Sequence, residues 1–260
     1  LVKVEVVFRN RHHLASDVLV ASAANRMLAE GTSKHTALQL ADGMDYFGAF
    51  YETEEGLDVN TVNLYTLTKH IGKTLPYLLE ILCDPVFPEP ELEVFRQNSI
   101  QRLRVNQEKV SYLARTAFNE MIFGKDHPYG YKTTAEEIKA LESKTLRSWY
   151  ESNYGLTGAM IFVAGQASEA VIAQLNATFG QVKPSANVNG QTGIGAAMPF
   201  LEKKHFVQKK DALQSAIRIG RPLFNKTHPD YHGLLFLNTV LGGYFGSRLM
   251  ANLREEKGFT

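Results

Sequence analysis

The first eight residues constrain the fold most, because they alternate between apolar and polar side chains. Val2, Val4, Val6 and Phe8 are apolar, and Lys3 and Glu5 fall between them. A period of two predicts a strand that buries one face and leaves the other open. The buried face needs a cover, and helical patterns dominate the sequence that follows. This order favours an α+β fold, with an antiparallel sheet flanked by helices.

The helical cover is predicted from apolar residues that recur every three or four positions. Two capping boxes mark helix starts, Thr36 with Gln39 and Thr134 with Glu137, because each side chain can satisfy a free backbone N–H of the first turn. We predict helices at 16–31, 36–48, 71–82, 90–103, 113–124, 145–154 and 168–179. Further strands are predicted at 49–53 and 57–67, as a hairpin, and at 159–163, as a buried strand,.

A change in composition divides the chain after residue 180. Residues 181–199 are rich in Gly, Asn, Ser and Pro and have no hydrophobic period, which is typical of a linker,. Two strand-like stretches and a helical one follow, at 203–208, 213–221 and 231–241. We therefore predict a first domain over 1–180, a linker over 181–199 and the start of a second, similar domain over 200–260. Both ends break off inside a pattern, so we expect a longer protein.

Composition excludes several classes of function. The 28 Lys and Arg residues nearly balance the 27 Asp and Glu residues, so no overall charge favours nucleic acid or an anionic membrane. The only cysteine, Cys83, lies in an apolar run, where we expect a buried structural thiol. A single cysteine also excludes an internal disulfide and a cysteine-based zinc site. No apolar run is long enough to cross a bilayer,.

The histidines do not form a recognisable metal motif by themselves. None of the eight lies in an H-x-x-E-H sequence, which places two imidazoles and a glutamate on one helical face,. His12 and His13 are adjacent in a predicted loop, and His127 lies in a turn where we expect a structural role. From residue chemistry alone, the chain has no self-contained active site.

One stretch near the end of the chain combines a glycine turn with a helix. Gly242 and Gly243 precede Ser247, which is placed to cap a helix that ends at Gly258,. Arg254 falls in the last turn of that helix. A cation there complements the helix dipole, which is its ordinary structural interpretation.

Five short landmarks, in this order and spacing, indicate a family. They are Met27–Thr32, Asp84–Pro88, His127–Gly130, Leu241–Gly243 and Leu253–Gly258. With them the chain resembles the insulinase/pitrilysin family of inverted zincins, in particular its small bacterial members related to the mitochondrial processing peptidase. The resemblance implies tandem α+β domains that close around a peptide chamber.

The same resemblance implies that the metal site is lost in this chain. The family's H-x-x-E-H motif falls on Ser22, Asn25 and Arg26, and its glutamate ligand falls on Gln101 or Arg102. Serine is a poor zinc ligand, an amide cannot act as a general base, and arginine is a permanent cation. On the peptide-binding edge strand, Tyr51–Glu52 replaces the usual Asn-Ala pair.

By contrast, the glycine-turn stretch matches the family. There the corresponding arginine approaches the peptide backbone together with a tyrosine, which in this numbering would follow Thr260. The resemblance therefore implies a substrate-binding role for Arg254, whose guanidinium can donate several hydrogen bonds to a carbonyl or an oxyanion.

These observations predict a non-catalytic, substrate-binding subunit or half of a zinc peptidase. It carries no cofactor itself, and zinc is expected on a homologous partner subunit or domain. Unfolded peptides are the expected substrates, and neither nucleic acid nor a membrane is an expected partner. The alternatives are a structural or assembly homologue and an autonomous zinc peptidase with unusual ligands. Both a cytoplasmic and a periplasmic bacterial location stay open, with the cytoplasm preferred.

Overall fold

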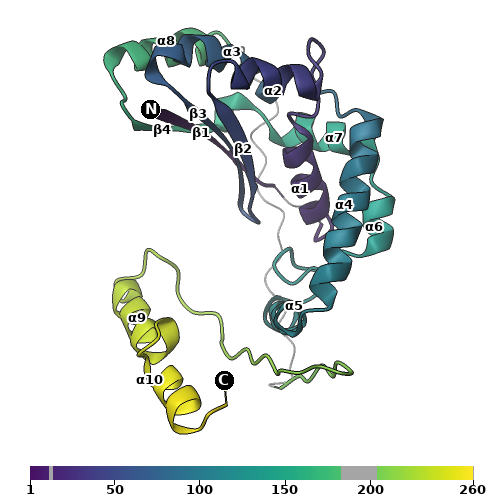
Figure 1. Cartoon of the computed structure of the whole chain (residues 1–260), viewed down its shortest axis with the longest axis vertical. Coiled ribbons are helices and arrows are strands. Elements are labelled where there is room, and N and C mark those ends of the chain that lie inside the picture. The colour runs from purple at the N-terminus through teal and green to yellow at the C-terminus, as the bar shows by residue number, and fades with distance from the viewer. Residues whose placement is uncertain (12–13, 183–203, 260) are drawn as a thin grey trace. The chain divides into compact units, whose positions relative to one another are not determined.

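A computed structural model describes residues 1–11, 14–182 and 204–259. The chain divides into two compact units, Leu1–Arg218 and Ile219–Thr260 (Figure 1). The predicted linker lies almost wholly outside the described residues, and the predicted domain boundaries stay predictions. No helix in the described ranges is both long and apolar enough to cross a membrane.

A four-stranded antiparallel sheet forms the centre of the first unit. Its strands are β1 (Val2–Arg9), β2 (Phe50–Glu55), β3 (Val59–Thr66) and β4 (Met160–Gly165), in the spatial order β2-β3-β1-β4. β2 and β3 form the predicted hairpin, with Tyr51 opposite Leu64. In the centre, Val4 faces Leu64 on one side and Val163 on the other. The strands β2 and β4 are the two edges of the sheet.

The helices of the first unit have boundaries that follow the sequence signals, and some of them cover one face of the sheet. They are α1 (Asp17–Met27), α2 (Ala37–Asp45), α3 (Ile71–Cys83), α4 (Glu89–Gln107), α5 (Val110–Phe123), α6 (Ala135–Lys139), α7 (Ser143–Asn153) and α8 (Glu169–Phe179), with 3-10 turns at Thr68–His70 and Leu156–Gly158. Both predicted capping boxes are formed, at Thr36 and Thr134. α2, α3 and α8 lie along the same side of the sheet (Figure 1). The α+β expectation is confirmed.

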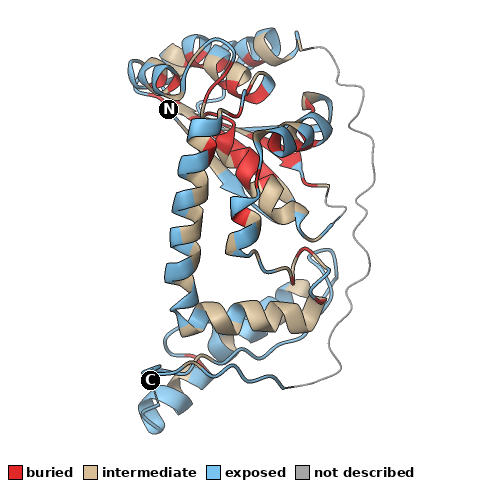
Figure 2. Cartoon of the chain, turned by 90° about the vertical axis from the view of Figure 1, so that its right-hand side faces the viewer, coloured by how far each residue is buried: buried red, intermediate tan, exposed pale blue. Residues whose placement is uncertain are grey.

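The core lies between the sheet and the helices (Figure 2). Val2, Val4 and Val6 are completely buried there, as are Leu64 and Leu78 from β3 and α3. This half of the alternating pattern supplies the apolar area that drives folding. The residues between them point to the opposite, more open face of the sheet, so the alternation in the first strand sets which side the helices occupy.

Two predictions about burial are wrong. β4 is not a buried strand, since Met160, Ile161 and Phe162 are each 39% to 54% exposed, because β4 is an edge strand with a neighbour on one side only. Cys83 is exposed rather than buried, because it is the last residue of α3. Nearby protein atoms still desolvate its thiol and, with Asp84, raise its pKa to about 11, so it remains a protonated, weak nucleophile at neutral pH.

The second unit is irregular up to residue 230 and largely helical after it. It contains α9 (Tyr231–Asn238), a π-helix at Thr239–Gly243, α10 (Arg248–Met250) and a π-helix at Ala251–Glu256. The strands predicted at 203–208 and 213–221 are wrong, because the described residues of both stretches are irregular. A strand needs a neighbour for its backbone groups, and two strands alone are marginal in water.

Replacing Leu78 by alanine tests where the core lies. Leu78 is fully buried between α3 and the sheet, so Leu78→Ala leaves a cavity and lowers the free energy of unfolding by about 2–5 kcal/mol. Leu38→Ala is the matched control, because Leu38 is 69% exposed, and its effect stays within about 0.5 kcal/mol. Urea unfolding of both variants measures the difference, and equal effects would contradict this core.

Candidate functional site

Helix α1 carries the three positions that the resemblance assigns to H-x-x-E-H. It packs against β2, β3 and α7, and its small residues Ala21, Ala23 and Ala24 are buried, which lets the helix approach the sheet. Ser22 and Arg26 are one turn apart and therefore share a face. Asn25 points inward and is completely buried. The backbone thus presents the three side chains together, as a metal-binding helix would.

Ser22 and Arg26 both bind the same carboxylate at the end of β2. The Ser22 hydroxyl donates a hydrogen bond of 3.0 Å to Glu55 Oε2, and the Arg26 guanidinium forms an ion pair with Glu55 Oε1. The two positions that the resemblance assigns to imidazoles therefore carry a hydroxyl and a guanidinium that already have a partner. Their common partner, Glu55, fixes the end of β2 against α1.

Asn25 uses its whole amide group in hydrogen bonds to the protein. Its Nδ2 donates to the carbonyl oxygens of Glu54, at 3.0 Å, and Thr61, at 3.4 Å. Its Oδ1 accepts a hydrogen bond of 2.9 Å from the Tyr154 hydroxyl. An amide has no basic lone pair comparable to that of a carboxylate. Asn25 therefore connects α1, the β2–β3 hairpin and the segment after α7, and it cannot take a proton from water.

A buried polar network extends from Asn25; we call Asn10, Asn25, Asn60 and Tyr154 the amide cluster. Asn60 Nδ2 donates to the Tyr154 oxygen at 2.9 Å and to the carbonyl of Ala21 at 3.2 Å. Asn10 Nδ2 donates to Asn60 Oδ1 at 3.2 Å. Burial raises the pKa of the Tyr154 phenol, against a hydrogen bond from Asn60 that lowers it. Tyr154 therefore keeps the proton that it donates to Asn25.

The position of the third family ligand does not complete a metal site. Gln101 and Arg102 are both exposed on α4, and the structure gives neither a hydrogen bond nor an ion pair to α1. Within the described ranges, no group of three or more His, Cys, Asp and Glu side chains could hold a metal ion. A hydroxyl, a carboxamide and two guanidinium groups do not suit zinc, which prefers imidazole, thiolate and carboxylate donors. The residues present do not fit the metal.

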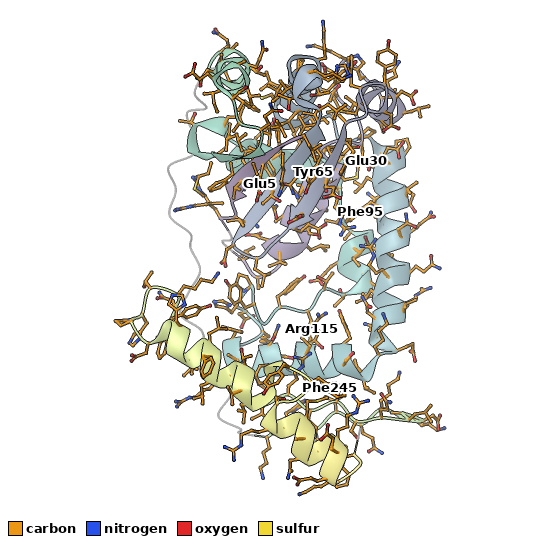
Figure 3. All side chains as sticks on the ribbon, turned by 60° about the vertical axis from the view of Figure 1, so that its left-hand side comes forward. Glu5, Glu30, Tyr65, Phe95, Arg115 and Phe245 are labelled. Carbon is orange, nitrogen blue, oxygen red and sulfur yellow. The ribbon has the colours of Figure 1, made fainter. Side chains whose placement is uncertain are left out.

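The open face of the sheet borders the β2 edge. Phe50 stacks on Tyr65 with ring centroids 4.6 Å apart, and Lys3 forms an ion pair of 2.7 Å with Glu5. Glu5 and Tyr65 come from neighbouring strands on this face (Figure 3). Asn63 is buried there, and its Oδ1 has no hydrogen-bond partner in the structure. The face thus combines an exposed aromatic platform, charged groups and an unpartnered amide oxygen.

The resemblance places the family's Asn-Ala pair at Tyr51 and Glu52 of β2, and these two residues have very different environments. Tyr51 is half-buried and packs against the core. Burial raises the pKa of its phenol, as does the nearby Glu30. Glu52, one residue on, is exposed. Because β2 is an edge strand, one side of its backbone is available to pair with an extended peptide.

In the second unit, Arg254 lies on a π-helix after the glycine turn. Its guanidinium carbon is 4.8 Å from the centre of the Phe245 ring, within reach of a cation–π contact, and the residue is exposed. Ser247 occupies the predicted N-cap position, but its hydroxyl makes no capping hydrogen bond. Instead Ser247 Oγ is buried without a partner. The turn therefore orients Arg254 through the Phe245 ring while its donors face solvent.

Of the three histidines named in the sequence analysis, one makes structural contacts and two lie outside the described residues. His127 Nδ1 accepts a hydrogen bond of 3.1 Å from the backbone N–H of Tyr129, and its ring stacks on Phe123. Burial lowers the pKa of His127 against the opposing charge of Asp58. These contacts fit a structural role in the turn. His12 and His13 fall outside the described residues.

Sequence reasoning missed the groups that complete this site. Glu55 binds Ser22 and Arg26, and Tyr154 binds Asn25. Both partners lie far from these residues in sequence, and no residue spacing signals the contacts. A polar Asn25 on the apolar side of a helix was the available signal, because buried amides in proteins are almost always hydrogen-bonded.

Residues 140–260 match the family described as Peptidase M16 inactive domain. An uncharacterized zinc protease of Bacillus subtilis is 22% identical over 253 residues, which are 96% of this chain and 60% of that protein. Another from Streptomyces coelicolor is 24% identical, over 90% of this chain and 52% of that protein. The chain spans about 60% or less of the length of these two relatives.

Two solved structures share the fold. The crystal structure of a peptidase M16 inactive domain from Pseudomonas fluorescens has a TM-score of 0.73 and 22% identity, and it covers 99% of this chain and 63% of that one. A protease from Helicobacter pylori has a TM-score of 0.78 and 15% identity, with 99% and 64% coverage.

The fold and the sequence comparisons together place the chain among the relatives of zinc peptidases. It is homologous to the M16 family of zinc protease-like proteins, and its residues from 140 onward match the inactive domain of that family. The family resemblance inferred from the five landmarks is confirmed.

Removing the Tyr154 hydroxyl tests the amide cluster. Tyr154→Phe leaves Asn25 Oδ1 without its buried partner, so we expect the free energy of unfolding to fall by about 1–3 kcal/mol. Tyr46→Phe is the matched control, because Tyr46 is 83% exposed, and its stability stays unchanged. A wild-type unfolding midpoint for Tyr154→Phe would show that the cluster does not stabilise the fold.

Glu30 lies in the Met27–Thr32 landmark, directly after α1 (Figure 3). Its carboxyl group makes the stability of the fold depend on pH. Burial raises its pKa, and Glu91 raises it further. The folded state therefore binds this proton more tightly than the unfolded state, so stability is lost as pH rises through the raised pKa. Glu30→Gln removes this loss: the variant is more stable than wild type at neutral pH, and the difference vanishes in acid.

Thermal unfolding across the pH range measures the effect of Glu30→Gln. Glu52→Gln serves as the control, because Glu52 is exposed, and it leaves the unfolding temperature unchanged. A Glu30→Gln difference that is the same at every pH would contradict the assignment of burial as its cause.

Proposed function

We propose that this chain is the non-catalytic, substrate-binding subunit or half of an M16 zinc peptidase. It supplies chamber wall and Arg254, and a homologous subunit or domain supplies H-x-x-E-H and zinc. The substrate is an unfolded peptide, which the pair degrades or processes. The chain binds no cofactor of its own.

The proposal rests on the contacts of the three α1 positions, whose side chains already bind other groups of the protein. Ser22 and Arg26 are both bound to Glu55, and Asn25 is buried in the amide cluster. A guanidinium where a dication would bind opposes metal binding electrostatically, since both charges are positive. Rebuilding a zinc site would require breaking an ion pair and a buried hydrogen-bond network, in addition to changing three side chains.

Peptide binding is supported by two features that remain accessible. The β2 edge offers backbone hydrogen-bond groups beside the open face of the sheet, with Phe50 and Glu52 exposed. Arg254 offers a guanidinium that can donate to a peptide carbonyl. Neither feature depends on a metal ion in this chain.

A structural or assembly homologue with no proteolytic role is the second candidate. The amide cluster favours it in one respect, because a polar network of this kind stabilises the fold whether or not the protein binds a peptide. An autonomous zinc peptidase with unusual ligands is the third, and the donor chemistry at α1 opposes it.

Substitution of Arg254 distinguishes the first two candidates. The full-length protein is combined with a co-encoded H-x-x-E-H homologue, and cleavage of a quenched fluorescent peptide is followed. Because a charge-assisted hydrogen bond to the peptide is removed, Arg254→Ala lowers kcat/KM about tenfold to a hundredfold. Arg254→Lys, which keeps the charge, loses less. Arg248→Ala is the matched control on the neighbouring exposed helix and leaves cleavage unchanged.

The same assay contains the outcomes that would overturn the proposal. If Arg254→Ala cleaves as fast as wild type, the substrate-binding role of Arg254 is wrong, and the result supports a structural or assembly homologue instead. If the full-length protein cleaves the peptide without its partner, the non-catalytic role is wrong and the autonomous candidate replaces it.

A further inference from the structure

A pocket opens at the corner between α4 and α5, away from the α1 positions along the chain. Its volume is about 230 Å³, compared with roughly 30 Å³ occupied by one water molecule in the liquid. All of its lining residues belong to the first unit: Asn106, Lys109, Ser111, Tyr112, Arg115 and Arg218. The pocket can therefore hold a small polar molecule together with water.

The lining contains three cations and no acidic side chain. Lys109 donates to the neutral Asn106 Oδ1 at 3.2 Å, and Arg115, on α5 (Figure 3), lies 5.5 Å from the centre of the Tyr112 ring. Neither they nor Arg218 form an ion pair with any described residue. The adjacent acid, Glu108, is already paired with Lys209 at 2.7 Å. No described acidic side chain therefore compensates the positive charge of the pocket.

The start of α5 adds to this positive potential. Lys109 is the N-cap residue and its side chain caps nothing, and the first turn contains no acidic residue. The backbone N–H groups of Val110 and Ser111 have no hydrogen-bond partner among the described residues. The free N–H groups and the dipole of this 14-residue helix favour an anion at its start. The side chains that line the cavity and the backbone at the start of α5 therefore both favour a negatively charged ligand.

We propose that this pocket binds a compact oxyanion, either a phosphate group or a carboxylate. Lys109, Arg115 and Arg218 supply charge, and Ser111 supplies a hydroxyl donor beside the free backbone N–H groups. The guanidinium groups of Arg115 and Arg218 suit the two oxygens that either anion presents. Because the pocket is open and its cations are exposed, binding is weak and competes with salt. The site is independent of the peptidase role proposed above.

Titration of the full chain with inorganic phosphate tests the site, followed by amide NMR or calorimetry at low ionic strength. We expect saturable binding of one phosphate, with the largest shifts at Val110 and Ser111. Lys109→Ala, Arg115→Ala and Arg218→Ala each weaken binding at least fivefold. Arg104→Ala is the control, because Arg104 is an exposed cation on α4 outside the pocket lining.

Two further experiments identify the anion and control for variants that fail to fold. Acetate, and a peptide with a free rather than an amidated C-terminus, show whether a carboxylate is bound as well as phosphate. Ser111→Asp places a carboxylate in the first turn of α5, so it abolishes phosphate binding while raising the unfolding temperature; Ser111→Asn does neither. Non-saturable binding, or equal weakening by Arg104→Ala and Arg115→Ala, would overturn the proposal.

Discussion

The hydrogen bond from the Tyr154 hydroxyl to Asn25 is the contact on which this arrangement depends. It joins the end of α7 to the last turn of α1, and the same hydroxyl accepts from Asn60 on β3. Asn25 in turn binds the backbone of the β2–β3 hairpin. Because the whole cluster is buried, each lost partner would leave a polar group unsatisfied. The network therefore fixes where α1 lies on the sheet.

The same contacts bear on the proposed function. In a zinc site the bound ion contributes to folding energy, because it cross-links its ligands. In this chain Ser22 and Arg26 bind Glu55, and Asn25 binds Tyr154, so hydrogen bonds and one ion pair link α1 to β2 and to the end of α7. Under the proposed function, these contacts hold α1 in place without a metal ion.

Much of the fold was predictable because local signals determine it. The capping boxes at Thr36 and Thr134 and the alternation in β1 require only neighbouring residues, and the structure confirms them. The exposure of β4 and of Cys83 could not be predicted, because it depends on which elements lie next to them. The strands predicted at 203–208 and 213–221 failed for the same reason: without a paired neighbour, β-forming residues remain irregular.

The candidate site was predictable only in part. The resemblance identified Ser22, Asn25 and Arg26, but not Glu55 or Tyr154, whose contacts with α1 span long stretches of sequence and have no characteristic spacing. Arg102 and Arg254 are placed by the same resemblance, and their roles stay predictions.

Under the proposed function, α1 carries a hydrogen-bonded network in place of a metal site. Zinc analysis of the purified full-length protein, after equilibrium dialysis against micromolar zinc, tests it most directly. The account predicts no stoichiometric zinc, and no change in zinc content when Ser22 or Arg26 is replaced by alanine. One zinc ion per chain, lost on replacement of either residue, would contradict it.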